Sequence, residues 1–212
     1  MNWLGKLLPQ ALPMSDEEAM RHVQRHGDHS AFTALVRRWE APIRRLCTRM
    51  TDDEHIGEDL AQEAFARVFA NRYQFQDGRR FSTWLWRIAL NLCRDDARRS
   101  GRKSEASFEY GSGVTDVSDS PAPDEMLVDK ERTSFVRKAL ASLPEAQRAV
   151  VILREYEGLK FREIAEVLNA PEGTVKSRMT DALAELSRQL GPILRDENAR
   201  AVKPRQMKAR LV

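Results

Sequence analysis

Residues 158–179 constrain the fold of this chain most, because they predict two short helices joined by a tight turn. The first helix has one apolar face, formed by residues at helical spacing: Phe161, Ile164, Ala165 and Leu168. Asn169 tolerates the left-handed conformation that often ends a helix, and Pro171 fits the first turn of the helix that follows. The stretch therefore predicts a helix-turn-helix unit.

The second of these helices separates an apolar side from a polar side. Val175, Met179 and Leu183 are predicted to face inward. The outward positions are polar: Lys176, Ser177, Arg178 and Thr180. In DNA-binding units of this kind the second helix lies in the major groove, where Arg pairs with guanine edges and Lys binds phosphate. The alternative is a helical hairpin with a solvated basic face, so the motif needs support from the rest of the chain.

The composition favours helical pieces with wide solvated faces over one large core. Charged residues make up 32% of the 212-residue chain, whereas a typical globular protein has about 25%. The net charge is only +3, so the distribution of basic residues matters more than their sum. We predict an all-α fold with two small helical domains joined by a flexible linker, the second domain containing the helix-turn-helix.

The cysteines and the N-terminus bear on the cellular compartment. Cys47 and Cys93 lie on predicted apolar helix faces and are expected to be small core residues, with a redox switch as the alternative. Reduced thiols fit a cytoplasmic protein. Residues 1–9 are apolar but too short to span a bilayer. We therefore expect a flexible arm over residues 1–14 and no stable membrane insertion.

Capping patterns place the first two helices. Ser15 and Glu18 form a capping-box pattern, and Gly27 should end the helix that starts there. Asp28 can cap a long second helix. Pro42 lies inside this second helix and should kink or divide it.

A third helix is predicted to open at Asp52 and Asp53, whose charges suit the positive end of a helix dipole. Three polar residues fall on one side of it, because positions three and four apart are neighbours: Asp59, Gln62 and Glu63. From the residues alone, this side is most simply a solvated face.

A loop over residues 73–80 precedes a fourth helix, which Ser82 is predicted to cap. Trp84 is expected in the core on its spacing, whereas Trp86 lies off the apolar stripe. Aromatic residues are interleaved with arginines in this loop and helix. That combination suits single-stranded nucleic acid, because bases stack on aromatic rings and arginines hold phosphates.

The pattern is lost over residues 104–124, where Gly, Ser, Asp and Pro dominate. This acidic linker separates the two helical domains, and Gly191 and Pro192 are expected to stop the last helix. The basic tail should be solvated, with a phosphate-binding arm as the alternative. The predicted divisions are the arm 1–14, the first domain 15–103, the linker 104–124, the second domain 125–190 and the tail 191–212.

No part of the sequence indicates catalysis. His22, His26 and His29 suggest a metal site, but no nearby cysteine or carboxylate completes a ligand set, so solvated histidines are expected. The chain has no nucleotide-binding glycine loop and no convincing catalytic constellation. We expect no enzyme activity, no cofactor and no metal.

Three motifs in order resemble the extracytoplasmic-function (ECF) group of bacterial RNA polymerase sigma factors, over about residues 15–190. Residues 57–65 resemble the family's core-polymerase-binding helix. Residues 81–95 resemble its promoter-melting helix. The second DNA-binding domain is represented by residues 143–148, 163–168 and 171–178. The order and separation of the three make the resemblance specific.

The resemblance implies a role for each part. The first domain, region 2, would bind core RNA polymerase through Asp59, Gln62 and Glu63 and would melt the minus-ten promoter element. The implied minus-ten contacts are Tyr73, Phe75, Phe81, Trp86, Arg87, Asn91 and Arg94. The second domain, region 4, would read the minus-thirty-five element through Thr174, Lys176, Ser177 and Arg178. The linker would thread the polymerase's RNA path, and an anti-sigma factor is a further partner expected from the family.

The chain departs from the family pattern at two positions, with Asn169 where Gly is common and Lys160 where a small hydroxyl residue is common. An ordinary helix-turn-helix repressor or response-regulator output domain is the runner-up, but it leaves the first domain without a role. A sigma mimic that only sequesters a regulator is a further alternative. Lys176 and Arg178 in the recognition helix argue against it.

Overall fold

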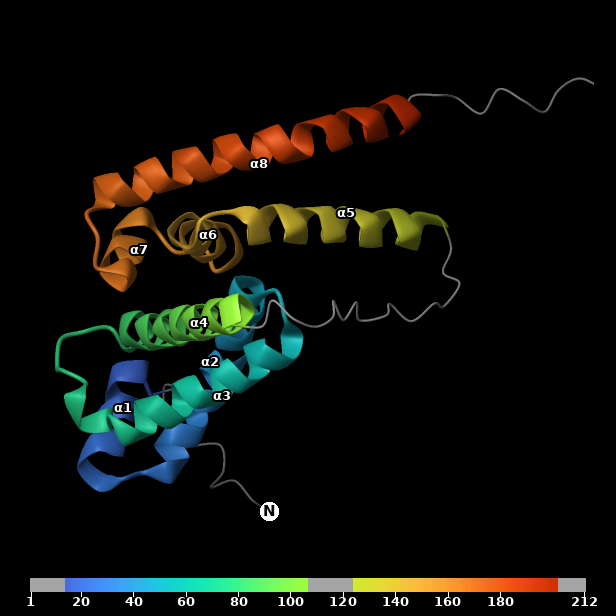
Figure 1. The fold of residues 1–212 in the computed structure, drawn as a ribbon. Helices are drawn as coiled ribbons and strands as arrows, with labels where there is room; N and C mark the ends of the chain where they lie inside the picture. Colours follow the sequence, from blue (N-terminus) through green and yellow to red (C-terminus); the bar gives the residue numbers. More distant parts are fainter. Residues whose placement is uncertain (1–13, 107–123, 202–212) are drawn as a thin grey trace, which may run out of the picture.

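The computed structural model describes residues 14–106 and 124–201, with side chains over 14–100 and 133–192. All regular structure in these residues is helical (Figure 1). The first domain contains α1 (Asp16–His26), α2 (His29–Thr51), α3 (Glu54–Ala70), the 3-10 turn η2 (Arg72–Gln74) and α4 (Phe81–Ala106). The second contains α5 (Asp124–Ser142), α6 (Glu145–Val151), the π-helical turn η3 (Ile152–Tyr156), α7 (Phe161–Leu168) and α8 (Glu172–Ala201). The predicted all-α fold is confirmed, whereas the arm up to residue 13 and the end of the tail lie outside the described residues.

The local capping signals act as predicted. The Ser15 hydroxyl accepts a hydrogen bond from the Glu18 N–H, and the Glu18 carboxylate accepts one from the Ser15 N–H, so the capping box is complete. Gly27 ends α1 with a positive φ of 61°. Asp28 caps α2 through the N–H groups of its first turn. Of the two effects predicted for Pro42, a kink or a division of the helix, the division does not occur, because α2 runs unbroken through it.

Helix α3 crosses α2 at very close range through Gly57. A Cβ atom at this position would lie 2.6 Å from the backbone nitrogen of Thr48 and 2.7 Å from its Cα. Real Cβ atoms essentially never approach backbone atoms so closely, and the Thr48 backbone sits inside α2 and cannot move aside freely. Only glycine allows the two helices to pack at this distance.

We expect Gly57→Ala to lower the free energy of unfolding of the chain by about 1–3 kcal/mol, the usual cost of overpacking. Gly173→Ala is the matched control, because a Cβ at that helical position would have no atom within 4 Å. Replacing a helical glycine by alanine where there is room for the Cβ should leave the free energy of unfolding unchanged or raise it by a few tenths to about 1 kcal/mol. Urea unfolding followed by circular dichroism measures both. Equal stability of the two variants would contradict the close crossing.

The second domain is built around the helix-turn-helix of α7 and α8. Asn169 takes the predicted left-handed conformation, with a φ of 49°. At the start of α7, the Glu163 carboxylate accepts a 2.9 Å hydrogen bond from the Lys160 N–H. This bond is one half of a capping box, and the side chain of Lys160 does not supply the other half, because it caps no N–H group of the first turn of α7.

Two predictions for α8 are wrong. Val175 and Met179 are buried as expected, but Leu183 is 49% exposed and Ala182 is fully buried in its place. The helix also does not stop at Gly191 and Pro192, since it continues to Ala201. Positions on one side of a helix are spaced three or four residues apart. The buried position that follows Met179 lies three residues on, at Ala182, and not four residues on, at Leu183.

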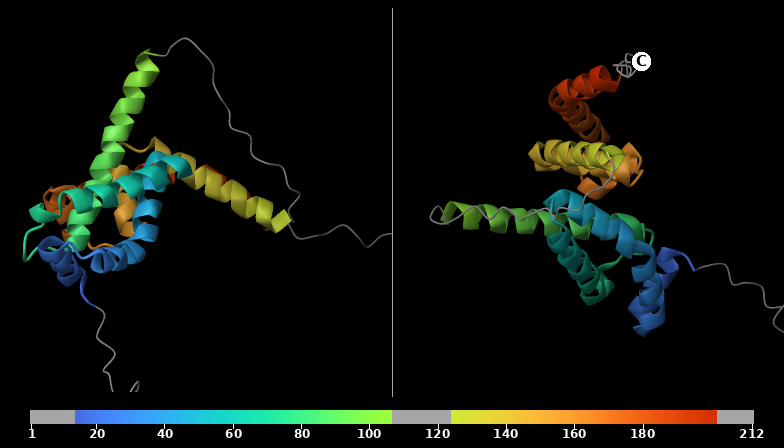
Figure 2. Two further views of the ribbon diagram at one scale, coloured as in Figure 1. Left: turned by 90° about the horizontal axis from the view of Figure 1, so that it is seen from below. Right: turned by 90° about the vertical axis from the view of Figure 1, so that its right-hand side faces the viewer.

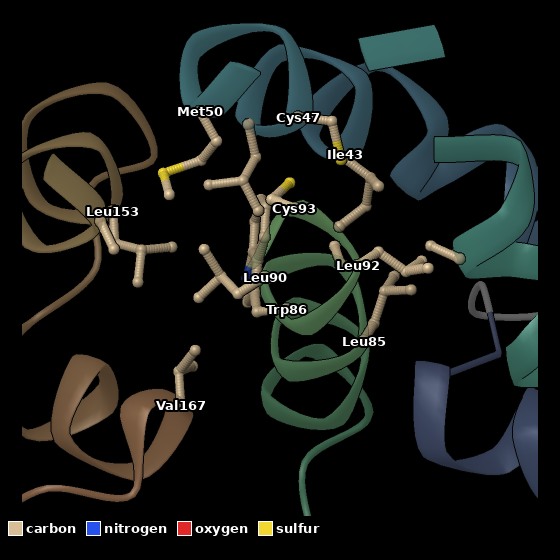
Figure 3. Close-up of a cluster of buried hydrophobic side chains, with 14 of the residues drawn as sticks. Ile43, Cys47, Met50, Leu85, Trp86, Leu90, Leu92, Cys93, Leu153 and Val167 are labelled. Atoms are coloured by element: carbon tan, nitrogen blue, oxygen red, sulfur yellow. The ribbon is translucent and has the colours of Figure 1, made fainter. Parts of the chain in front are cut away.

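The two domains pack against each other along α4. In Figure 1, α4 lies between the other helices of the first domain and the α6–α7 part of the second. Figure 2 shows the C-terminal part of α4 and the N-terminal part of α5 projecting from the packed helices. The seam is apolar at its centre, where Met50 and Leu90 of the first domain face Leu153 and Val167 of the second (Figure 3). All four side chains are buried.

Candidate nucleic-acid interface

The polar side of α3 is open to solvent. Asp59, Gln62 and Glu63 are all exposed, even though the second domain is packed on the first. Glu63 accepts a 2.8 Å hydrogen bond from Arg67 one turn further on. Buried Leu60, Ala64 and Val68 hold the opposite side of the helix in the core. The sequence therefore identified a set of side chains that the fold brings together on one accessible surface.

The loop before α4 is fixed to the first helix of the domain. The Gln24 side-chain amide donates hydrogen bonds of 2.7 Å to the carbonyls of both Arg72 and Phe75. The predicted Ser82 cap is wrong, because α4 begins one residue earlier. Its first N–H, that of Phe81, donates instead to the Glu17 carboxylate of α1 at 3.0 Å.

Three of the aromatic residues predicted to contact DNA are interior residues. Phe75 and Phe81 are 5% and 0% exposed, and their rings pack at 6.2 Å in a cluster with Trp84. Phe75 and Phe81 therefore belong to the core of the first domain, and the prediction that they contact DNA directly is wrong. Tyr73, at 70% exposure, is the accessible ring of the loop.

Trp86 is the third corrected residue. It is only 3% exposed, and its ring meets that of Trp39 edge-on at 5.7 Å. It lies at the seam with the second domain, which covers the side of α4 that the apolar stripe of the first domain leaves free (Figure 3). The expectation for Trp86 is thus wrong, because the sequence pattern of one helix does not report a second domain packed on its other side. Trp84 is half-buried and packs against the core of the first domain, as expected from its spacing.

An arginine row runs along the seam side of α4. It consists of Arg80, Arg87 and Arg94, spaced seven residues apart, which is about two helical turns. Each member is held by the second domain. Arg80 pairs with Glu163 at 2.5 Å, Arg94 pairs with Glu145 at 2.6 Å, and Arg87 donates to the carbonyls of Glu166 and Val167 at 2.5 and 3.3 Å. The predicted minus-ten residues Arg87 and Arg94 are therefore engaged within the chain, whereas Asn91 remains exposed.

The ion pair with Arg80 also acts on Glu163. The hydrogen bond from the Lys160 N–H, together with the Arg80 guanidinium, holds the pKa of the Glu163 carboxyl below its usual value of 4.5. Stabilisation from a lowered carboxyl pKa is present above the unfolded pKa and is lost as the pH falls through the folded pKa. The contact is therefore fully formed at neutral pH.

A second set of contacts joins α2 and its C-terminal cap to the second domain. Arg45 and Arg49 of α2 flank the Glu157 carboxylate at 3.2 and 3.8 Å, and Arg137 pairs with Asp52 at 2.8 Å. In addition, Arg148 donates a 2.9 Å hydrogen bond to the Met50 carbonyl at the end of α2. Burial lowers the pKa of the Arg148 guanidinium. Sequence analysis missed all these residues, because the partners lie 85 to 112 residues apart and no local pattern marks them.

The predicted minus-thirty-five residues lie together on the first two turns of α8. Lys176 and Ser177 are exposed, and Thr174 and Arg178 are half-buried. Lys176 pairs with Glu172 at 2.7 Å in its own helix. Val175, fully buried between them, fixes the helix against the rest of the domain. The structure therefore presents the four side chains from one rigid helix.

Within the described residues, no group of three or more potential ligands is placed to hold a metal ion. His22 and His26 meet edge-on at 6.0 Å, and His29 stacks on Phe69. None of the described helices is long and apolar enough to cross a membrane. Cys47 and Cys93 are free and buried.

Comparison with known proteins supports both domains. Residues 35–103 match the model of sigma-70 region 2, and residues 136–186 match that of sigma-70 region 4. These matches define a two-domain protein of the sigma-70 type. They lie inside the predicted ranges 15–103 and 125–190.

Individual relatives specify the group. The ECF RNA polymerase sigma factor SigW of Bacillus subtilis is 36% identical over 77% of this chain and 91% of its own length. The RNA polymerase sigma-H factor of Pseudomonas aeruginosa is 33% identical over 85% of this chain and 96% of its own length. The solved structure of CnrH in complex with the cytosolic domain of CnrY shares the fold, with a TM-score of 0.64 at 24% identity over 84% of this chain and 97% of that one.

The chain belongs to the ECF RNA polymerase sigma factors. Its function is that of a sigma factor, which binds core RNA polymerase and directs promoter-specific transcription initiation through the minus-ten and minus-thirty-five elements. Sigma factors are initiation factors rather than enzymes. The resemblance seen in the sequence is therefore confirmed.

Proposed function

We propose that the exposed polar side of α3, formed by Asp59, Gln62 and Glu63, is the surface that binds the clamp coiled coil of core RNA polymerase. Its accessibility supports this assignment, since all three side chains face solvent while Leu60, Ala64 and Val68 bury the opposite side of the helix. The two carboxylates suit a basic partner surface. The protein would carry out this role in the cytoplasm, where it meets the polymerase.

We further propose that Tyr73, Arg87, Asn91 and Arg94 act on the minus-ten element. Tyr73 offers an exposed ring on which a base can stack, and the arginines can hold the phosphates of the melted strand. Capture of a flipped base must return a few kcal/mol of lost stacking. Phe75, Phe81 and Trp86 support this surface from inside and are not its contacts.

The minus-thirty-five element is assigned to α8. Thr174, Lys176, Ser177 and Arg178 occupy the N-terminal turns of a recognition helix, which is the part that contacts base edges in helix-turn-helix proteins. An anti-sigma factor is a further partner in this proposal. Its support is that solved structures of the same fold include a complex of RpoE from Bartonella quintana with the anti-sigma factor NepR, at 23% identity and a TM-score of 0.60.

The observation that carries the proposal is the separation of three distinct surfaces on one chain that matches both sigma-70 regions. In vitro transcription with purified core polymerase and a pool of promoter fragments tests it. New transcripts that share a two-element upstream motif are expected only when the protein is present. DNA binding without core-dependent initiation would indicate a repressor, and core binding without any DNA contact would indicate a sigma mimic.

Reversing the charges on α3 tests the polymerase surface. The double variant Asp59→Lys, Glu63→Lys should weaken binding to core polymerase at least tenfold, because like charges would then face a basic surface. Circular dichroism should remain unchanged, since both side chains are exposed. Glu40→Lys on α2 is the control for a charge reversal at another exposed position. Fluorescence titration with core polymerase measures the affinities of the wild type, the double variant and the control. Equal affinities would show that the polar side of α3 does not bind the polymerase.

A further inference from the structure

A cavity of about 620 Å³ lies between α2 of the first domain and α5 and η3 of the second. Small-molecule sites in proteins usually have volumes of about 300–1,000 Å³. None of the residues assigned above to polymerase, minus-ten or minus-thirty-five binding lines this cavity. The sigma-factor function therefore leaves it without a role.

Three residues give the cavity an apolar side: Val136, Leu140 and Tyr156. Leu140 is buried and Val136 is half-buried, whereas Tyr156 is 40% exposed. The Arg49 guanidinium lies 4.2 Å from the centre of the Tyr156 ring, across the boundary between the two domains. A ligand with an apolar body would remove this surface from water, which favours binding.

Four arginines line the same cavity: Arg44, Arg45, Arg49 and Arg137. Within the described residues they pair with three carboxylates, those of Asp52, Glu54 and Glu157. The Glu157 side chain is only 4% exposed and is shared by Arg45 and Arg49. The four arginines thus exceed their carboxylates by one charge, which matches a ligand with a single negative charge.

Two of these arginines have N–H groups to offer such a ligand. Arg44 approaches Glu54 only to 3.6 Å, and Arg49 approaches Glu157 only to 3.8 Å. Close hydrogen bonds between a guanidinium and a carboxylate are about 2.7–2.9 Å long. Both guanidiniums can therefore bind an anion in the cavity without the loss of a close ion pair.

We propose that this cavity binds a small amphipathic carboxylate, whose charged head lies on the arginines and whose aliphatic body lies on the apolar side. The size of the cavity favours a small molecule over a helix of a partner protein, because two turns of a helix about 10 Å wide occupy roughly 850 Å³. The proposal is independent of the surfaces assigned to polymerase and promoter.

The walls of the cavity come from both domains. The complete site therefore exists only while the domains are packed together, and a bound ligand stabilises that arrangement. The ligand thus acts as a bridge between α2 and α5.

The test uses the full chain and sodium dodecanoate below its micelle-forming concentration, with isothermal titration calorimetry as the measurement. We expect one saturable site with a Kd of about 1 mM or lower, as for a ligand of this size. Dodecyltrimethylammonium has the same chain length and the opposite charge, and it should bind roughly tenfold more weakly or less. Equal affinity for the two ions would overturn the proposal, because it would show adsorption to apolar surface alone.

Variants locate the site. Arg44→Gln should weaken dodecanoate binding about two- to fivefold, as expected for a partly exposed ion pair. Arg37→Gln is the matched control, since Arg37 is exposed on the same helix and does not line the cavity. Val136→Trp should abolish binding, because the indole would fill the cavity, and its circular dichroism should match that of the wild type. Equal affinity of the two arginine variants, or undiminished binding by the Val136 variant, would place the ligand elsewhere and overturn the proposal.

Amide hydrogen exchange tests the bridge between the domains. Saturating dodecanoate should slow exchange in both α2 and α5, because both helices line the cavity. Protection confined to one of the two helices would contradict an interdomain site.

Discussion

Replacing Phe81 by alanine is expected to lower the free energy of unfolding by about 3–5 kcal/mol, the usual cost of truncating a buried aromatic residue. The Phe81 side chain is 0% exposed and its ring is surrounded by those of Trp39, Phe75 and Trp84 at 6.2–6.5 Å. Removing it would leave a cavity at the point where α4 begins. Urea unfolding of the full chain, followed by circular dichroism, measures the loss.

Tyr73→Ala is the matched variant in the same loop region. Its side chain is 70% exposed, so stability should stay within about 0.5 kcal/mol of the wild type. Promoter opening by the reconstituted holoenzyme should nevertheless fall, because the stacking surface is lost. The opposite pattern, with a stable Phe81 variant and an unstable Tyr73 variant, would show that the burial of these rings has been assigned wrongly.

Replacing Arg178 by alanine should weaken recognition of the minus-thirty-five element by about 1–3 kcal/mol, or roughly 5- to 150-fold, if it makes a bidentate base contact. The side chain lies on the second turn of α8 and is half-buried, so its orientation is restricted by its neighbours. Arg178→Lys retains the charge but loses the planar pair of donors. It should therefore keep much of the affinity while relaxing base preference at one position.

Competition between promoter duplexes that differ at single base pairs measures this preference. Arg162→Ala, at a position where the side chain is 79% exposed on α7, controls for the loss of one positive charge in the same domain. If Arg178→Lys keeps the wild-type base preference, Arg178 contacts phosphate and specificity lies in Ser177 or Thr174. If the alanine variant binds every duplex as well as the wild type, Arg178 does not contact the minus-thirty-five element.

Local chemistry explains which parts of the fold could be predicted from sequence. The capping box at Ser15, the glycine that ends α1 and the left-handed Asn169 act through neighbours three or four residues away, and all three appear as expected. The same holds for the polar side of α3, which depends only on helical periodicity. These features need no knowledge of the rest of the chain.

Features that depend on distant packing were predicted poorly. Trp86 was misassigned because the second domain covers α4 from outside, and Leu183 because the core of the second domain meets Ala182 instead. The arginine row was recognised as basic, but its partners lie 51 to 83 residues away. Gly191 and Pro192 are weak helix formers, yet α8 continues past them.

The unequal exposure of the three surfaces has a consequence for the order of events in the cell. On the proposed assignments, a chain whose α3 is exposed while its arginine row is held by the second domain would bind the polymerase before it engages melted DNA. Spare copies would then leave single-stranded regions of the chromosome unoccupied. Single-stranded DNA would be bound only by molecules that are already attached to RNA polymerase.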